Sequence, residues 1–137
     1  MKTNRIFVDT SFFKGMSDQD DDFHEESIKI LEKLSDQNFE FITTNYILDE
    51  TYTLIRKRCG YQDSIDFHDG LRGGFLNLAI LRVEIDDEIL AWKLFQEKWS
   101  KLSFTDCTSF AVMKRIELKD VATFDNHFSR AGFIIFK

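Results

Sequence analysis

Proline is absent from this sequence of 137 residues, which contains only six glycines and two cysteines. The lack of proline rules out a collagen-like or proline-rich chain. Cys59 and Cys107 lie far apart and form no CxxC pair, which argues against a zinc ribbon or a thioredoxin-type redox site. We therefore expect two free thiols in a reducing compartment.

Long apolar runs are also missing, because no stretch of apolar residues exceeds four. A membrane-spanning helix needs about 20 such residues, and the core of a secretory signal needs about 7 to 15. We therefore expect a soluble, cytoplasmic protein that does not bind membranes. The hydrophobic content of 43% and charged content of 31% are typical of globular proteins. The length predicts a single domain over residues 1–137.

The net charge of −6 argues at first against a nucleic-acid partner. Residues 18–26 (DQDDDFHEE) contain six acidic side chains and no lysine or arginine, and the rest of the chain carries 18 acidic and 18 basic residues. Basic clusters occur at residues 56–58 and 114–115. The total charge therefore does not decide the partner.

Short β-rich runs alternate with helical patterns along the chain. Strands are expected at residues 5–8, 39–43, 78–83, 121–124 and 133–136. Helices are expected at residues 23–36, 45–58, 62–72, from 86 onward, 104–118 and 126–130. This alternation predicts an α/β fold with a parallel sheet flanked by helices on both faces.

Four carboxylates fall near the predicted carboxyl ends of the strands, the edge where open α/β sheets bind ligands. Asp9 and Asp125 directly follow strands, Glu50 lies one to two turns into a helix, and Asp106 lies in a first helical turn. Each acid alone has an ordinary explanation, such as a helix cap or a solvated side chain. Asp49 serves as a control, because neighbours on a helix point about 100° apart.

Gathered carboxylates repel one another, and a pair about 4 Å apart costs roughly 4 kcal/mol at an effective dielectric near 20. Hard oxygen ligands favour Mg²⁺ or Mn²⁺ over zinc. Such ions activate water and stabilise the charge that develops on a phosphodiester. The pattern therefore favours a metal-dependent nuclease.

Four segments resemble the motifs of PIN-domain ribonucleases, in particular the VapC-type toxins of toxin–antitoxin pairs. The segments are residues 7–11 (FVDTS), 43–50 (TTNYILDE), 102–106 (LSFTD) and 122–128 (ATFDNHF). Each motif is weak alone, but the four occur in order along essentially the whole chain. The resemblance implies a PIN-like parallel five-stranded sheet in the order 3-2-1-4-5.

The resemblance also implies a Mg²⁺ or Mn²⁺ site built from Asp9, Glu50, Asp106 and Asp125. The first three would hold the principal metal, directly or through water, and Asp125 would hold a second metal or orient the attacking water. Polar supporting residues of the family correspond to Ser11, Thr44 and Thr105. The implied partners are an RNA substrate and a cognate antitoxin, and a homodimer is a further expectation because family members often dimerise.

Other readings of the acidic residues are less consistent with the sequence. Asp18, Asp20 and Asp22 begin like a calcium loop, but Phe23 replaces the glycine at position six and Lys29 the glutamate at position twelve. The alternative function is a catalytically inactive or receiver-like α/β scaffold that binds proteins. It leaves two of the four aligned acids unexplained, and a receiver usually carries paired acids after its first strand.

The histidines and one aromatic pair receive no catalytic role. His24, His68 and His127 show no metal-ligand spacing and are interpreted as surface or packing residues. Phe12 and Phe13 are interpreted as an exposed pair available to a partner. Most of the other aromatic residues are expected in the core.

Overall fold

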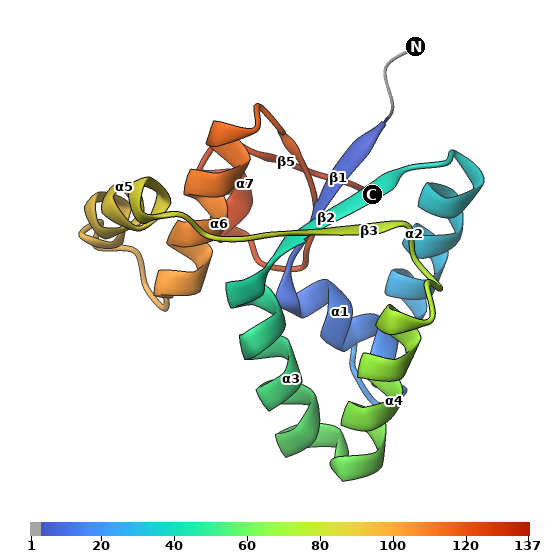
Figure 1. Cartoon of the computed structure of the whole chain (residues 1–137). Coiled ribbons are helices and arrows are strands. Elements are labelled where there is room, and N and C mark those ends of the chain that lie inside the picture. The colour runs from blue at the N-terminus through green and yellow to red at the C-terminus, as the bar shows by residue number, and fades with distance from the viewer. Residues whose placement is uncertain (1–3) are drawn as a thin grey trace.

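A computed structural model describes residues 4–137 (Figure 1). The strands are β1 (Arg5–Val8), β2 (Glu40–Thr44), β3 (Leu78–Leu81), β4 (Asp120–Ala122) and β5 (Ile134–Ile135). The helices are α1 (Thr10–Ser17), α2 (His24–Asp36), α3 (Asn45–Cys59), α4 (Tyr61–Arg72), α5 (Ile85–Phe95), α6 (Phe104–Arg115) and α7 (His127–Arg130). Within this part of the chain, no helix is both long and apolar enough to cross a membrane.

The five strands form one parallel sheet in the order β3-β2-β1-β4-β5, which confirms the predicted fold class. Phe7 of the central strand pairs with Ile42 of β2 and Val121 of β4. Ile6, Phe7 and Val8 are fully buried although consecutive side chains point to opposite faces, so helices cover both faces of the sheet.

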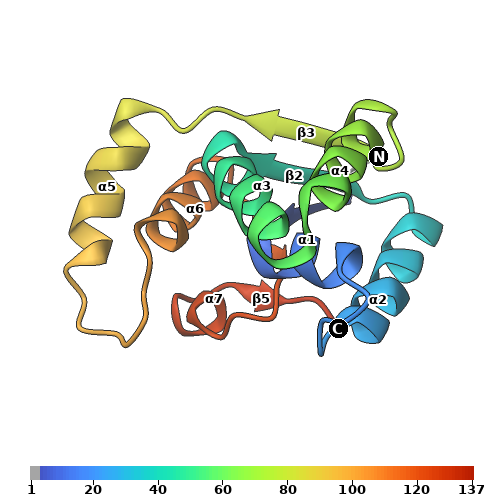
Figure 2. The ribbon, with the colours of Figure 1, turned by 90° about the horizontal axis from the view of Figure 1, so that it is seen from below.

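The helices contact one another around the sheet. Helix α1 contacts α2 and α3, α3 also contacts α4 and α6, and α6 in turn contacts α5 and α7. Both views show α5 set off from the sheet, beyond α6 (Figures 1 and 2). Helix α5 exposes large hydrophobic side chains, among them those of Ile85, Ile89 and Trp92.

Phenylalanine dominates the core, as the composition indicates. Phe110 packs edge-on against Phe128 with ring centroids 4.9 Å apart. Phe12 and Phe13 are also buried, at 1% and 0% exposure, so the prediction of an exposed pair is wrong. They lie on the inner face of α1, where they join the core and are not available to a partner.

Helix α1 was not expected from the sequence, because Gly15 and several β-branched or polar residues weaken its helical signal. Asp9 caps its first turn by accepting a hydrogen bond from the Ser11 backbone N–H. A Cβ at position 15 would collide with the Ser27 side chain of α2, so glycine here permits the close packing of the two helices.

The helix predicted over residues 104–118 ends earlier, at Arg115. Ile116 caps it, and Glu117 adopts a left-handed backbone with φ of 57°, which a continuing helix cannot accommodate. The following strand β4 ends at Ala122, two residues before the predicted end. Thr123 and Phe124 therefore lie beyond the strand, at the carboxyl edge of the sheet, where both take part in hydrogen bonds.

Candidate active site

Asp9 lies where β1 ends, and its carboxylate is held by hydroxyl groups. Its Oδ2 accepts hydrogen bonds from Thr123 Oγ1 at 2.7 Å and from Ser11 Oγ at 2.9 Å. The residue is 4% exposed. Two separate segments therefore fix the orientation of this buried acid.

The same hydroxyls organise the chain after β4. Ser11 Oγ accepts from the Phe124 backbone N–H at 2.9 Å, and Thr123 Oγ1 accepts from the Asp125 N–H at 3.0 Å. The two hydroxyl oxygens lie 3.1 Å apart. This network ties the carboxyl ends of β1 and β4 together and places Asp9 and Asp125 at one edge, as the parallel topology predicts. Thr123 belongs to the fourth motif, but sequence reasoning gave it no role.

Asp106 lies in the first turn of α6 and is both a cap residue and part of the acidic edge. Its backbone N–H donates to Ser103 Oγ at 2.9 Å, and its Oδ2 accepts from the Ser103 N–H at 3.1 Å. This reciprocal capping box fixes the side chain. Ser103 thus supports Asp106, and the carbonyl oxygen of Thr105 accepts hydrogen bonds from the Thr108 and Ser109 hydroxyls within α6. The supporting role of Thr105 stays a prediction.

His127 joins the acids Asp106 and Asp125 in a compact group. Its Nδ1 lies 2.9 Å from Asp125 Oδ1 and 3.7 Å from Asp106 Oδ2. One ligand atom from each of the three residues lies within 4.8 Å of the others, a spacing that fits a metal ion. The interpretation of His127 as a surface or packing residue missed this contact. The sequence signal that could have indicated this contact is the position of His127 only two residues after Asp125.

The carboxylates influence one another electrostatically. Burial raises the pKa of Asp9 to about 6, with a further upward contribution from Asp125, although the Thr123 and Ser11 hydrogen bonds lower it. Burial, together with the charges of Asp9 and Asp125, raises the pKa of Asp106 to about 7. Such crowding of acids is the environment that a divalent cation would neutralise.

The pKa of His127 responds to the same acids. Burial lowers the pKa, but the contact with the Ser100 carbonyl, the contact with the Asp125 side chain and the charges of Asp125 and Asp106 all raise it, so the net shift is upward. The electrostatic environment at this edge therefore favours positive charge.

Glu50 does not join this group directly. It is exposed on the second turn of α3, and the compact group found among residues 4–137 consists of Asp106, Asp125 and His127 without it. Asp49 is exposed as well, so burial does not separate the two. Tyr46, one turn before Glu50, donates to Glu88 of α5 at 2.7 Å, which places this face of α3 toward α5.

Thr44, which was predicted as a supporting residue, caps α3 by accepting from the Ile47 N–H at 3.1 Å.

A shallow cavity of about 630 Å³ lies beside Asp125 and His127. Lys101 and Arg130 contribute positive charge to its lining. Arg130 also lies over the ring of Trp99, at 4.5 Å from the centroid. Basic side chains next to an acidic centre suit a substrate whose backbone is negatively charged.

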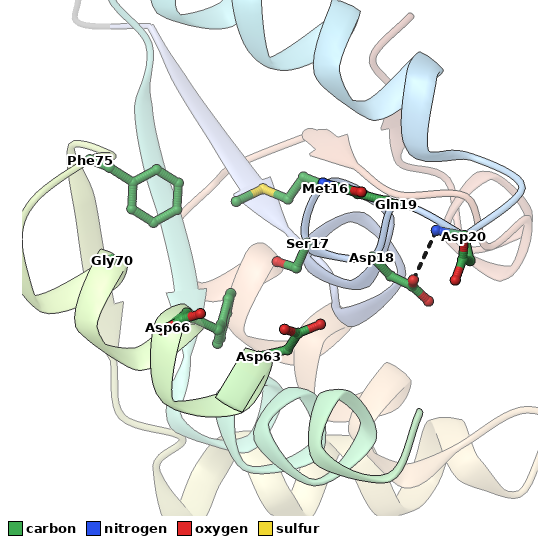
Figure 3. A pocket seen from close by; sticks show the side chains of 10 residues that line it. Met16, Ser17, Asp18, Gln19, Asp20, Asp63, Asp66, Gly70 and Phe75 are labelled. Atoms are coloured by element: carbon green, nitrogen blue, oxygen red, sulfur yellow. Dashed lines mark hydrogen bonds between the residues drawn. The ribbon is translucent and has the colours of Figure 1, made fainter. Parts of the chain in front are cut away.

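A second cavity, of about 560 Å³, lies between the end of α1 and helix α4 (Figure 3). Asp18, Asp20, Asp63 and Asp66 line it, with Phe75 at its rim. None of these residues belongs to the Asp106 group. The four carboxylates would repel RNA phosphates, so this cavity does not extend a nucleic-acid site.

A family model described as PIN domain matches residues 6–134. The chain therefore belongs to the PIN domain family, a family of metal-dependent nucleases. This confirms the family predicted from the four motifs and the prediction of an enzyme, and it removes the case for a receiver-like scaffold.

Individual relatives are similar over nearly the whole length. The 23S rRNA-specific endonuclease VapC20 of Mycobacterium tuberculosis is 29% identical over 129 residues, which cover 94% of this chain and 95% of the relative. The crystal structure of VapC20, described as a Sarcin-Ricin loop cleaving toxin, aligns with a TM-score of 0.83 at 32% identity, covering 94% of this chain and 96% of the other. FitAcB from Neisseria gonorrhoeae aligns with a TM-score of 0.69 at 17% identity, covering 96% of each chain, and shows the fold alone.

Proposed function

We propose that this nuclease is a VapC-type toxin ribonuclease that hydrolyses RNA phosphodiester bonds with Mg²⁺ or Mn²⁺. The observation that carries the proposal is the convergence of Asp9, Asp106 and Asp125 at one edge of the sheet, with the pKa values of Asp9 and Asp106 raised by burial and mutual repulsion. The full-length similarity to the endonuclease VapC20 supports it.

In this proposal the three acids and Glu50 hold the cation, directly or through water. A bound divalent cation activates water and stabilises charge at phosphorus. Hydrogen bonds from Thr123 and Ser11 keep the Asp9 carboxylate in a fixed orientation. Glu50 would approach from α3, and its exposed side chain has the freedom to turn toward the edge when a cation is present.

Lys101 and Arg130 would contact the phosphate backbone of the RNA beside the acids. Such contacts position the strand and carry little sequence information. We infer ribosomal RNA in the cytoplasm as the substrate class, because VapC20 is specific for 23S rRNA and cleaves the Sarcin-Ricin loop.

The VapC-type resemblance also implies a small antitoxin encoded beside the gene. We expect this partner to cover the acidic edge and to insert a basic side chain between Asp106 and Asp125, where the electrostatic environment favours positive charge. Expression of this chain alone should slow bacterial growth, and co-expression of the neighbouring gene should restore it. Toxicity of Asp9→Asn equal to that of the wild type would argue against ribonuclease toxicity.

A homodimer through α5 is the third part of the proposal. Ile85, Ile89 and Trp92 form an exposed stripe on this helix, with 76%, 57% and 58% exposure. Asp86 lies near one end of the helix and Lys93 near the other. Antiparallel pairing of two copies would bury the stripe and bring each acidic first turn beside Lys93 of the other copy.

The decisive experiment measures Mn²⁺-dependent cleavage of an RNA containing a ribosomal stem-loop. Asp9→Asn, Glu50→Gln and Asp106→Asn each remove one charge with little change in shape, and each should lower the rate at least about tenfold, or about 1.4 kcal/mol. Asp49→Asn is the matched control and should retain the activity.

Loss of activity in the Asp49→Asn variant equal to that in Glu50→Gln would contradict the assignment of Glu50. Full activity in Asp106→Asn, or cleavage unaffected by chelator, would contradict the proposed metal centre.

A further inference from the structure

We propose that His127 is a metal ligand through Nδ1, so that the cation is held by an imidazole nitrogen as well as by carboxylates. This inference rests on the proposed function, because it concerns the same cation. It adds a residue that the motif comparison does not assign, and it changes which ion the site prefers.

The first step is the orientation of the ring. His127 Nε2 lies 2.7 Å from the carbonyl oxygen of Ser100. A carbonyl oxygen only accepts hydrogen bonds, so Nε2 carries the proton and donates it. In the neutral ring this leaves the lone pair on Nδ1, and a cation that binds there displaces the proton that Nδ1 carries when the ring is charged. Metal-ligating histidines almost always donate their second ring N–H to a carbonyl or carboxylate in this way.

The second step is where Nδ1 points. It faces Asp125 Oδ1 at 2.9 Å and Asp106 Oδ2 at 3.7 Å. The atom is buried, and among residues 4–137 it lies within ion-pair distance of both acids without forming a well-aligned hydrogen bond. Asp125 Oδ1 already accepts from the backbone N–H of His127 at 2.9 Å. A buried ring nitrogen directed at two acids suits coordination of a cation, which would take the place of the Nδ1 proton that an ion pair with Asp125 needs.

The third step is rigidity. The His127 ring lies parallel to the ring of Trp99, with centroids 6.2 Å apart and an interplanar angle of 7°. The guanidinium of Arg130 covers the Trp99 ring. Trp99 and Ser100 both come from the segment between α5 and α6, so this segment fixes the imidazole before any ion binds. Such preorganisation is typical of a ligand rather than of a solvated surface histidine.

The spacing is compatible with coordination. Ligand atoms bound at about 2.1 Å to an octahedral ion lie roughly 3 Å apart when adjacent. The atoms offered by Asp106, Asp125 and His127 lie within 4.8 Å of one another. Small side-chain rotations would therefore complete the arrangement.

A nitrogen ligand changes the expected ion. Mg²⁺ prefers oxygen ligands, whereas imidazole is a good ligand for first-row transition metals. His127 therefore favours Mn²⁺ over Mg²⁺ at this site. Carboxylates alone would accept either ion.

Pulsed electron paramagnetic resonance of the Mn²⁺-loaded protein tests the assignment directly. A coordinated imidazole produces a nitrogen hyperfine coupling to Mn²⁺, and labelling histidine with ¹⁵N should change that coupling. We expect the signal in the wild type and its loss in His127→Phe, which keeps an aromatic ring against Trp99. His68→Phe is the matched control, because His68 is exposed on α4, and it should retain the signal.

Calorimetry provides the second measurement. His127→Phe should weaken Mn²⁺ binding at least about tenfold and Mg²⁺ binding by less than about threefold, while His68→Phe changes neither. Bound Mn²⁺ without nitrogen coupling in the wild type would overturn the inference, even if RNA cleavage is normal. Failure of the wild type to bind Mn²⁺ at all would instead refute the proposed function. The wild-type spectrum decides the matter even if His127→Phe does not fold.

Discussion

Thr123 donates a 2.7 Å hydrogen bond to Asp9, joining residues that lie 114 positions apart in the sequence. The same Thr123 oxygen accepts from the backbone N–H of Asp125. One hydroxyl therefore orients the acid after β1 and the loop that carries the acid after β4. This contact makes the spacing of the two acids a property of the folded sheet rather than of flexible side chains.

Replacement of Thr123 by valine tests this relationship, since valine keeps the branched shape but removes the hydroxyl. The Thr123 hydrogen bond lowers the pKa of Asp9, so its loss should raise that pKa further. Hydrogen bonds to charged groups contribute about 1.5–3 kcal/mol, which predicts at least about tenfold weaker Mn²⁺ binding at pH 7. Calorimetric titration measures this, and Thr123→Ser should restore most of the affinity. Unchanged binding by the valine variant would show that the hydroxyl is dispensable.

The metal-free protein should become less stable as pH rises from about 4 to about 7. The pKa values of Asp9 and Asp106 are raised to about 6 and about 7, from 3.8 for the ordinary group. Acids with raised folded-state pKa values destabilise the fold increasingly above the unfolded pKa, until they are fully ionised. The raised pKa of His127 acts in the same direction, because its stabilisation is lost as pH rises through the folded value.

Urea unfolding in chelator at about pH 4, 5.5, 7 and 8 measures this dependence. Asp106→Asn should flatten it and should be at least as stable as wild type at pH 8, since asparagine still offers an oxygen to the Ser103 N–H. A variant far less stable than wild type at pH 8 would mean that Asp106 acts chiefly as a helix cap.

Metal binding should stabilise the wild type strongly. An ion that binds only the folded state adds about 2.7 kcal/mol at 100 times its dissociation constant, which corresponds to roughly 10 °C in a domain of this size. Asp106→Asn should lose most of that increment. Four melting curves, wild type and variant with Mn²⁺ and with chelator, make the comparison. An equal increment in both proteins would place the ion elsewhere.

The α5 surface gives a prediction about assembly. Trp92→Glu places a charge in the exposed stripe and should shift the protein from dimer to monomer in analytical ultracentrifugation. Phe75→Glu is the control, because Phe75 is also half-exposed but lies away from α5, and it should leave the mass unchanged. A monomeric wild type, or a dimeric Trp92→Glu variant, would count against pairing through α5.

Much of the site followed from the chain alone because parallel strands bring their carboxyl ends to one edge. This reasoning placed Asp9 and Asp125 at the same edge, and it gave the correct sheet order once the family resemblance was added. It gave no role to the hydroxyl of Thr123, because a threonine between two strand-like residues carries no local signal of a contact across 114 positions. The position of Glu50 as a metal ligand stays a prediction.

Other features depend on tertiary contacts that a linear pattern does not contain. Helix α1 forms against its weak local propensity because Phe12 and Phe13 are buried in the core. The role of His127 depends on Ser100, which is 27 positions away and fixes one ring nitrogen. Spacing between histidines gives no indication of such an arrangement.

Anomalous diffraction from crystals soaked in Mn²⁺ tests the central claim most directly, because it locates the ion without reference to activity. The account predicts a dominant peak within coordinating distance of Asp106 and Asp125, near Asp9. A dominant peak far from these acids, or none there at saturating Mn²⁺, would contradict it.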